Sequence, residues 1–200
     1  MYTRNMFWTD SNGLEMQERQ KSWRSWGYNT TFSTDEIESA NFYPINSAIF
    51  LQDPRTSMQF TVMNDRSQGG TSLNDGEIKL MQNRRLLHDD SRGVGEALNE
   101  TTDLGVGIEV NAVYHLQFFN YTTTGSAQRP TQLTVDEPMR FFVASSLKDE
   151  LSINTSNGVV QVPEFAGDLK IHTIPFAEKT ILVRLENIAD SPNYNNDDAP

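Results

Sequence analysis

The stretch GIEVNAVYHLQFF, residues 107–119, decides the fold class because apolar and polar residues alternate along it. The apolar residues fall on one face of an extended chain: Val110, Ala112, Tyr114, Leu116 and Phe118. The polar ones fall on the other: Glu109, Asn111, His115 and Gln117. Successive side chains of a strand point to opposite sides of its sheet, so the stretch predicts a half-buried strand.

The same alternation recurs in both directions along the chain, as in MQFTVM (58–63) and EIKL (77–80). Other predicted strands are INSAIFLQ (45–52), QLTV (132–135), MRFFVAS (139–145), GVVQV (158–162), LKIHTI (169–174) and TILVRLENI (180–188). Short helices are expected only around 14–24 and 147–151. The pattern predicts an all-β protein, a large antiparallel β-sandwich of the supersandwich kind.

The domain organisation follows from where the alternation stops. Residues 1–165 are predicted to form the sandwich, and residues 166–175 a connector that lacks alternation. Residues 176–190 are predicted to be the first strand of a further small β domain whose other strands lie elsewhere. Residues 191–200 are polar and end in proline, which indicates a mobile tail.

The charge and composition exclude several classes of partner. With 27 acidic and 16 basic residues, the net charge of −11 argues against binding to nucleic acid or to anionic lipid. No apolar run approaches the roughly 20 residues that span a bilayer. Cysteine is absent, which removes disulfides, thiol nucleophiles and thiolate metal sites. No secretory signal peptide is visible at Met1.

No complete catalytic or metal site can be assembled from these residues. Asp89 and Asp90 could suggest a glycosidase pair, but adjacent residues of an extended chain point to opposite sides. The three histidines are far apart in sequence, at 88, 115 and 172, and provide no zinc-ligand spacing. DRSQGG (65–70) is not a G-x-S-x-G nucleophile elbow, and its two glycines are expected to form a turn.

The best candidate for a binding site is NRRLLHDDSRGVGE, residues 83–96. Three arginines, two adjacent aspartates and two glycines stand close together there: Arg84, Arg85, Arg92, Asp89, Asp90, Gly93 and Gly95. A guanidinium suits bidentate contacts to carboxylates or paired sugar hydroxyls. On these residues alone, an ion-paired structural loop is favoured over the wall of a binding site.

Four longer stretches together resemble the C-terminal β region of glycoside hydrolase family 38 α-mannosidases. They are FWTDSNGLEMQER (7–19), NFYPINSAIFLQD (41–53), the segment from Phe60 to Glu100, and ILVRLEN (181–187). The centre of the resemblance is 60–100, where DRSQGG, RRLL, DD and RGVGE follow each other in order. DRSQGG and RGVGEALNE resemble the lysosomal or acid class.

The resemblance implies a zinc-dependent, retaining exo-α-mannosidase that removes terminal α-mannose from N-glycans and oligosaccharides. Its catalytic groups and zinc would lie in an N-terminal domain whose motifs are absent from these 200 residues. The chain is therefore expected to be a non-catalytic portion that binds no metal itself. Its expected partners are the N-terminal catalytic portion and mannose-containing glycans, with a homo-oligomer left open, in the lysosome, the vacuole or the secreted fraction.

The resemblance also gives roles to single residues. Arg92, with Asp90 and Gly93, is expected to form a wall of the active site, while Arg84, Arg85 and Asp89 brace the loop. The four N-x-S/T sequons at Asn29, Asn99, Asn120 and Asn154 become candidate glycosylation sites. Two other functions stay open, a free-standing carbohydrate-binding module and a structural β-sandwich protein.

Overall fold

The computed structural model describes residues 1–10, 12–13, 15–23, 37–93, 95–123, 127–138, 169–177 and 180–187. They fall into two units, Met1–Asp136 and Glu137–Pro200. Strands dominate the described residues of both units, which confirms the predicted all-β class.

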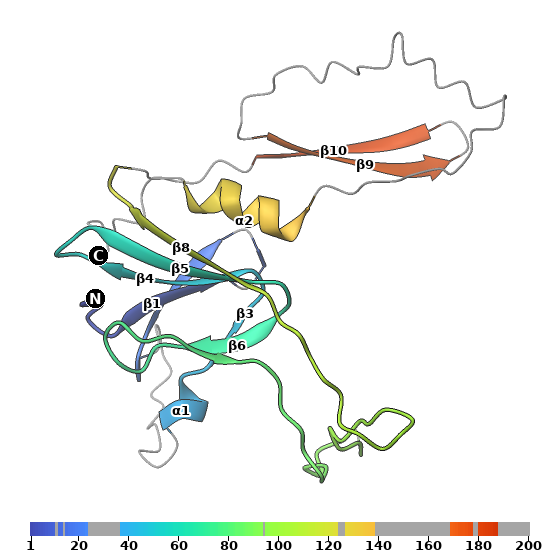
Figure 1. Cartoon of the computed structure of the whole chain (residues 1–200). Coiled ribbons are helices and arrows are strands. Elements are labelled where there is room, and N and C mark those ends of the chain that lie inside the picture. The colour runs from blue at the N-terminus through green and yellow to red at the C-terminus, as the bar shows by residue number, and fades with distance from the viewer. Residues whose placement is uncertain are drawn as a thin grey trace. The chain divides into compact units, whose positions relative to one another are not determined.

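Two antiparallel sheets build the first unit (Figure 1). The large sheet has the order β2 (Met16–Gln20), β1 (Met6–Asp10), β4 (Ala48–Asp53), β5 (Met58–Asn64) and β8 (Tyr114–Asn120). The small sheet has the order β3 (Tyr43–Ile45), β6 (Gln68–Thr71) and β7 (Lys79–Met81). Two helices accompany them, α1 (Ile37–Ala40) and α2 (Gln128–Asp136).

The hydrophobic core lies between the two sheets. Alternation in β1, β4 and β5 brings Phe7, Ile49, Leu51 and Val62 to one face of the large sheet, where they meet Ile45 of β3. Tyr43 and Leu80 of the small sheet pack against this cluster. Burying a side chain of this size stabilises the fold by about 1.5–3 kcal/mol. The predicted β-sandwich is therefore confirmed.

The opposite face of the large sheet is more polar and carries α2. Gln59 Nε2 donates to Gln128 Oε1 at 2.6 Å, and Gln132 Nε2 donates to the carbonyl of Gly13 at 2.8 Å. The strand predicted at 132–135 is therefore wrong, because these residues belong to α2. Four residues are too few to separate the strand period from the helical one, and Pro130 in the first turn suits a helix, where its missing N–H costs nothing.

Two further predictions about strands need correction. The helix expected around 14–24 is wrong, since β2 occupies Met16–Gln20 and pairs with β1 from Met6↔Gln20 to Asp10↔Met16. In the opening stretch, only Tyr114 onward joins the sheet. β5, the neighbour of β8, ends at Asn64, which pairs with Tyr114, so residues 107–113 have no strand beside them there. The predictions at 139–145, 147–151 and 158–162 lie outside the described residues.

A hairpin of β9 (Leu169–Ala177) and β10 (Thr180–Asn187) forms the described part of the second unit. The strand predicted at 176–190 therefore finds its partner within this chain, and β9 occupies most of the segment 166–175 that was expected to be a connector. β9 extends beyond the strand predicted at 169–174, through Pro175 to Ala177, because β10 pairs along it. Glu186 of β10 contacts His172 Nε2 across the hairpin at 3.0 Å and Arg184 of its own strand at 3.8 Å. The domain limits themselves stay a prediction.

Neither α1 nor α2, nor any other helix among the described residues, has the length and apolar character that a bilayer crossing requires.

Candidate functional site

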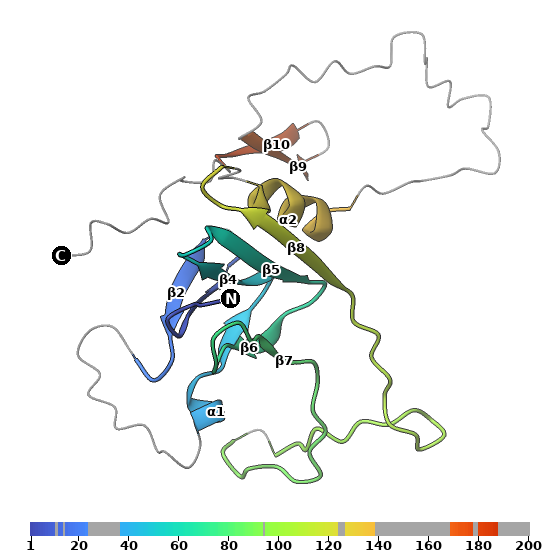
Figure 2. The same ribbon diagram turned by 60° about the vertical axis from the view of Figure 1, so that its left-hand side comes forward.

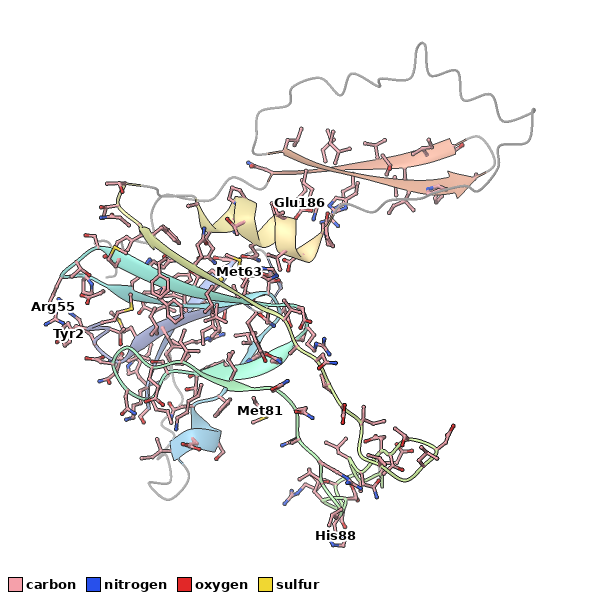
Figure 3. The ribbon with its side chains drawn as sticks, viewed as in Figure 1. Tyr2, Arg55, Met63, Met81, His88 and Glu186 are labelled. Carbon is pink, nitrogen blue, oxygen red and sulfur yellow. The ribbon has the colours of Figure 1, made fainter. Side chains whose placement is uncertain are left out.

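Residues 82–113, which connect β7 to β8, leave the sandwich as a long excursion that we call the arm. Both views show the arm extending away from the two sheets (Figures 1 and 2). Met81 marks its beginning at the small sheet, and His88 lies at its far end (Figure 3). The whole predicted site, residues 83–96, therefore lies on the arm rather than on the sandwich.

A backbone contact joins the outgoing and returning limbs of the arm, where the Leu86 N–H donates to the carbonyl of Leu98 at 2.8 Å. Within the returning limb, Thr101 pairs with Gly107 as an isolated antiparallel bridge. Nearer the sandwich, Gln82 Nε2 donates to the carbonyl of Val110 at 3.3 Å. The arm is thus formed by two extended limbs that lie side by side, and its described residues form no regular strand.

The two adjacent aspartates shape the tip by accepting backbone N–H groups. Asp89 Oδ2 accepts from Ser91 N at 2.8 Å, and Asp90 Oδ1 accepts from Arg92 N at 3.0 Å. Such contacts two residues along the chain stabilise tight turns. Ser91 and Gly93 take positive φ, at 59° and 136°, which glycine adopts with little strain.

Ion pairing does not brace the tip. Across the described part of the chain, Asp89 and Asp90 have no ion pair with Arg84, Arg85 or Arg92. The ion-paired loop favoured by the residue types alone is therefore not what the structure forms. Asp89 and Asp90 act on the backbone instead, and the exposed Arg92 side chain remains available to another surface.

A cavity of about 370 Å³ lies between the limbs of the arm. Arg84 and Arg85 line it from the outgoing limb, and Glu100, Ile108 and Val110 line it from the returning limb. Arg92, Asp90 and Gly93 are not among its lining residues. The structure thus brings the two predicted bracing arginines together but places Arg92 apart from them, nearer the tip.

Exposed apolar side chains are a feature that the sequence did not reveal. Leu104 is 89% exposed, and Val106 and Ile108 are also more than half exposed. On β8, Leu116 and Phe118 are 64% and 65% exposed, although they lie on the same face as the core residues of β5. Phe118 stacks on Phe60 with 4.4 Å between ring centroids. Among the described residues, the short strands of the small sheet leave Leu116 and Phe118 uncovered, which no local pattern could have indicated.

The titratable residues of the described segments form no cluster of three or more that could hold a metal ion. His88 lies at the tip of the arm, His115 on β8 and His172 in the hairpin of the second unit.

Two of the four sequons lie within the described residues. Asn99 is exposed on the arm. Asn120 ends β8, and its Oδ1 accepts from both the N–H of Thr122 at 3.0 Å and the Thr122 hydroxyl at 2.7 Å. Asn29 and Asn154 fall outside the described part.

Residues 1–92 match the family model described as "Glycosyl hydrolases family 38 C-terminal domain". The chain is 44% identical to the lysosomal alpha-mannosidase of Bos taurus over 135 residues, covering 67% of this chain and 12% of the relative. It is 33% identical to the lysosomal alpha-mannosidase of Dictyostelium discoideum over 197 residues, covering 94% of this chain and 19% of the relative. It is 29% identical to the alpha-mannosidase of Canavalia ensiformis over 198 residues, covering 94% and 20%. The chain therefore spans no more than a fifth of the length of these relatives.

Proposed function

Since the chain contains the C-terminal domain of the family 38 glycosyl hydrolases, we propose that it is the non-catalytic C-terminal portion of a zinc-dependent, retaining α-mannosidase. The complete enzyme would remove terminal α-mannose from N-glycans and oligosaccharides. The zinc ion would be held by the catalytic portion, as the family resemblance implies, and would supply a Lewis acid at the sugar. No residue of this chain is assigned to it.

The observation that carries the proposal is the exposed apolar surface of the arm and of β8. Leu104, Val106 and Ile108 of the arm and Leu116 and Phe118 of β8 are all more than half exposed. Large exposed apolar surfaces of this kind indicate contact with another protein surface. We infer that the N-terminal catalytic portion of the same enzyme covers them, since the relatives are at least five times longer than the matched region.

Within this assembly the arm would form a wall of the active site. Arg92 would donate to a substrate hydroxyl or to an active-site carboxylate, and Asp90 and Gly93 would set the backbone that presents it. Arg84, Arg85 and Asp89 would support the arm from behind. The contacts of Asp89 with Ser91, and the placement of both arginines in the cavity between the limbs, support that role.

The lysosomal relatives favour a lysosomal or vacuolar enzyme, or a secreted one. Such a protein would be glycosylated, and Asn120 is the sequon that the structure supports best. It ends a strand beside the turn at 121–123, and its amide oxygen accepts from the Thr122 hydroxyl. Peptide mass spectrometry of native protein would compare Asn120 with Asn29, Asn99 and Asn154.

The test is to assay this chain alone and the complete enzyme with an aryl α-mannoside and zinc. The complete enzyme should turn the substrate over, and the chain alone should not. Turnover by the isolated chain would contradict the proposal. Tight binding of mannose glycans by the isolated chain would favour a carbohydrate-binding module, and ordered self-assembly without sugar binding would favour a structural protein.

A further inference from the structure

The segment DRSQ, Asp65–Gln68, follows β5 and carries a set of polar contacts that the proposed function leaves unexplained. Asp65 and Arg66 are adjacent and form a two-pronged pair. Arg66 Nε lies 2.9 Å from Asp65 Oδ1, and Arg66 Nη2 lies 2.8 Å from Asp65 Oδ2. Such a fork holds both side chains in one orientation, and each still has hydrogen-bonding capacity to spare.

Both members of the pair use that capacity on the returning limb of the arm. Arg66 Nη2 donates to the carbonyl of Asn111 at 2.8 Å. Asp65 Oδ2 accepts from the N–H of Val113 at 3.1 Å. At the start of β8, the Tyr114 hydroxyl accepts from Gln68 Nε2 at 2.8 Å and donates to Gln68 Oε1 at 3.1 Å. The segment therefore binds residues 111–114, where the arm ends and β8 begins. We call this place the root of the arm, and the contacts of Asp65, Arg66 and Gln68 with it the grip.

The other side of the same segment is fixed to the sandwich. Ser67 Oγ donates to Asn46 Oδ1 at 2.9 Å, and Asn64 Nδ2 lies 3.3 Å from the carbonyls of Ile45 and Asn46. The grip is thus anchored on the β3–β4 connection of the core rather than on a free loop.

The two glycines that follow complete the anchor. They lie in β6, so the turn expected at this pair is wrong. A Cβ on Gly70 would lie 3.1 Å from Ile45 Cδ1 and 3.3 Å from Ile49 Cδ1. β6 can approach the core this closely only because Gly70 has no side chain. The close approach fixes the position of the preceding segment, Asp65–Gln68, relative to the core.

We infer that Asp65 and Arg66 are positioning residues that fix the root of the arm and thereby the place of Arg92. The inference about the root stands on this chain alone, whereas its consequence for catalysis rests on the proposed function. Arg66 also holds the pKa of Asp65 at about 2, so the carboxylate remains ionised in any compartment of mild acidity.

The test combines two measurements on Arg66→Ala and Arg66→Lys. The first is hydrogen exchange of this chain, followed by mass spectrometry of peptides from the arm. Arg66→Ala should raise exchange across 82–113 by about tenfold, and Arg66→Lys by less, because an ammonium cannot form the fork. The matched control is Arg55→Ala, which removes an arginine of the turn between β4 and β5. Arg55 contacts Asp53 and Tyr2 and lies far from the arm (Figure 3).

The second measurement is kcat/KM of the complete enzyme with each variant. Arg66→Ala should lower it by about three- to tenfold, and Arg55→Ala should leave it unchanged. Unchanged exchange in the arm of Arg66→Ala would overturn the inference. Faster exchange with normal kinetics would confirm that the pair holds the root while contradicting the proposed place of the arm at the active site.

Discussion

The sandwich and the arm are built from similar residues and held by different forces. In the sandwich, Phe7, Ile49 and Leu51 are fully buried between two sheets. In the arm, Leu104, Val106 and Ile108 are exposed, and order comes from backbone hydrogen bonds and from the grip at its root. Because burial is the main source of stability, the sandwich can maintain itself, whereas the arm depends on what lies at its two ends.

Two aspartates show the difference at single residues. Asp10 is fully buried and accepts the N–H groups of Asn46, Ser47 and Ala48 through Oδ1 at 2.9–3.0 Å, and that of Gly13 through Oδ2 at 2.8 Å. Asp89 also accepts a backbone N–H, from Ser91, but beside solvent. The same chemistry joins two strands of a core in one case and shapes a surface turn in the other.

The largest effect should come from removing the buried member of that pair. Asp10→Ala leaves four backbone donors without a partner, two of them buried, so we expect the free energy of unfolding to fall by about 3 kcal/mol or more. Asp89→Ala leaves the N–H of Ser91 to water and should change the free energy of unfolding by less than about 0.5 kcal/mol. Urea denaturation of both variants gives the two values. Equal losses would mean that the arm and the sandwich unfold as one structure.

Arg92 tests the arm, where a substitution should change the activity of the complete enzyme more than the stability of the fold. In the complete enzyme, Arg92→Ala should lower kcat/KM by about ten- to a hundredfold, the loss expected for a hydrogen bond to a charged group. Arg92→Lys should recover only part of it. The melting temperature should stay within about a degree of the wild type, because the Arg92 side chain is exposed and makes no hydrogen bond or ion pair among the described residues.

A matched control for Arg92 is Arg184→Ala, which removes an exposed arginine from β10. Its kinetics should equal those of the wild type. If Arg92→Ala instead lowers the melting temperature and leaves kcat/KM intact, the tip of the arm has a structural role only.

The sequence predicted those features that depend on neighbours along the chain. β5 and the strand at 180–187 follow from local alternation, whereas β9 occupies most of a segment that was expected to be a connector. The misses depend on distant partners. β8 starts where its neighbour β5 ends. Asp10 binds the backbone of three residues more than thirty positions away, and DRSQ binds the returning limb of the arm. Charged residues close in sequence also suggested ion pairs, but the aspartates of the tip bind the backbone instead.

The smallest expected effect concerns pH and the root of the arm. Arg66 lowers the pKa of Asp65 from its usual 3.8 to about 2 in the folded protein. A carboxyl with a lowered folded pKa contributes stability above its unfolded pKa and loses it as pH falls through the folded value. The grip should therefore be complete from neutral pH down to about 4 and weaken only between about 4 and 2.

Hydrogen exchange of the arm, corrected for the intrinsic pH dependence of exchange, tests this. In the wild type, exchange in 82–113 should be constant between neutral pH and about pH 4.5, where Asp65 stays ionised. Asp65→Asn, which keeps the shape but removes the charge, should show faster exchange at every pH in this range, with no dependence on pH. Asp75→Asn is the control, because that carboxylate accepts from Thr3 and Asn5 on the sandwich and should leave the arm unchanged. An arm that already loosens in the wild type between about pH 6 and 5 would mean that a group other than Asp65 governs its root, since a carboxyl with so low a pKa cannot titrate there.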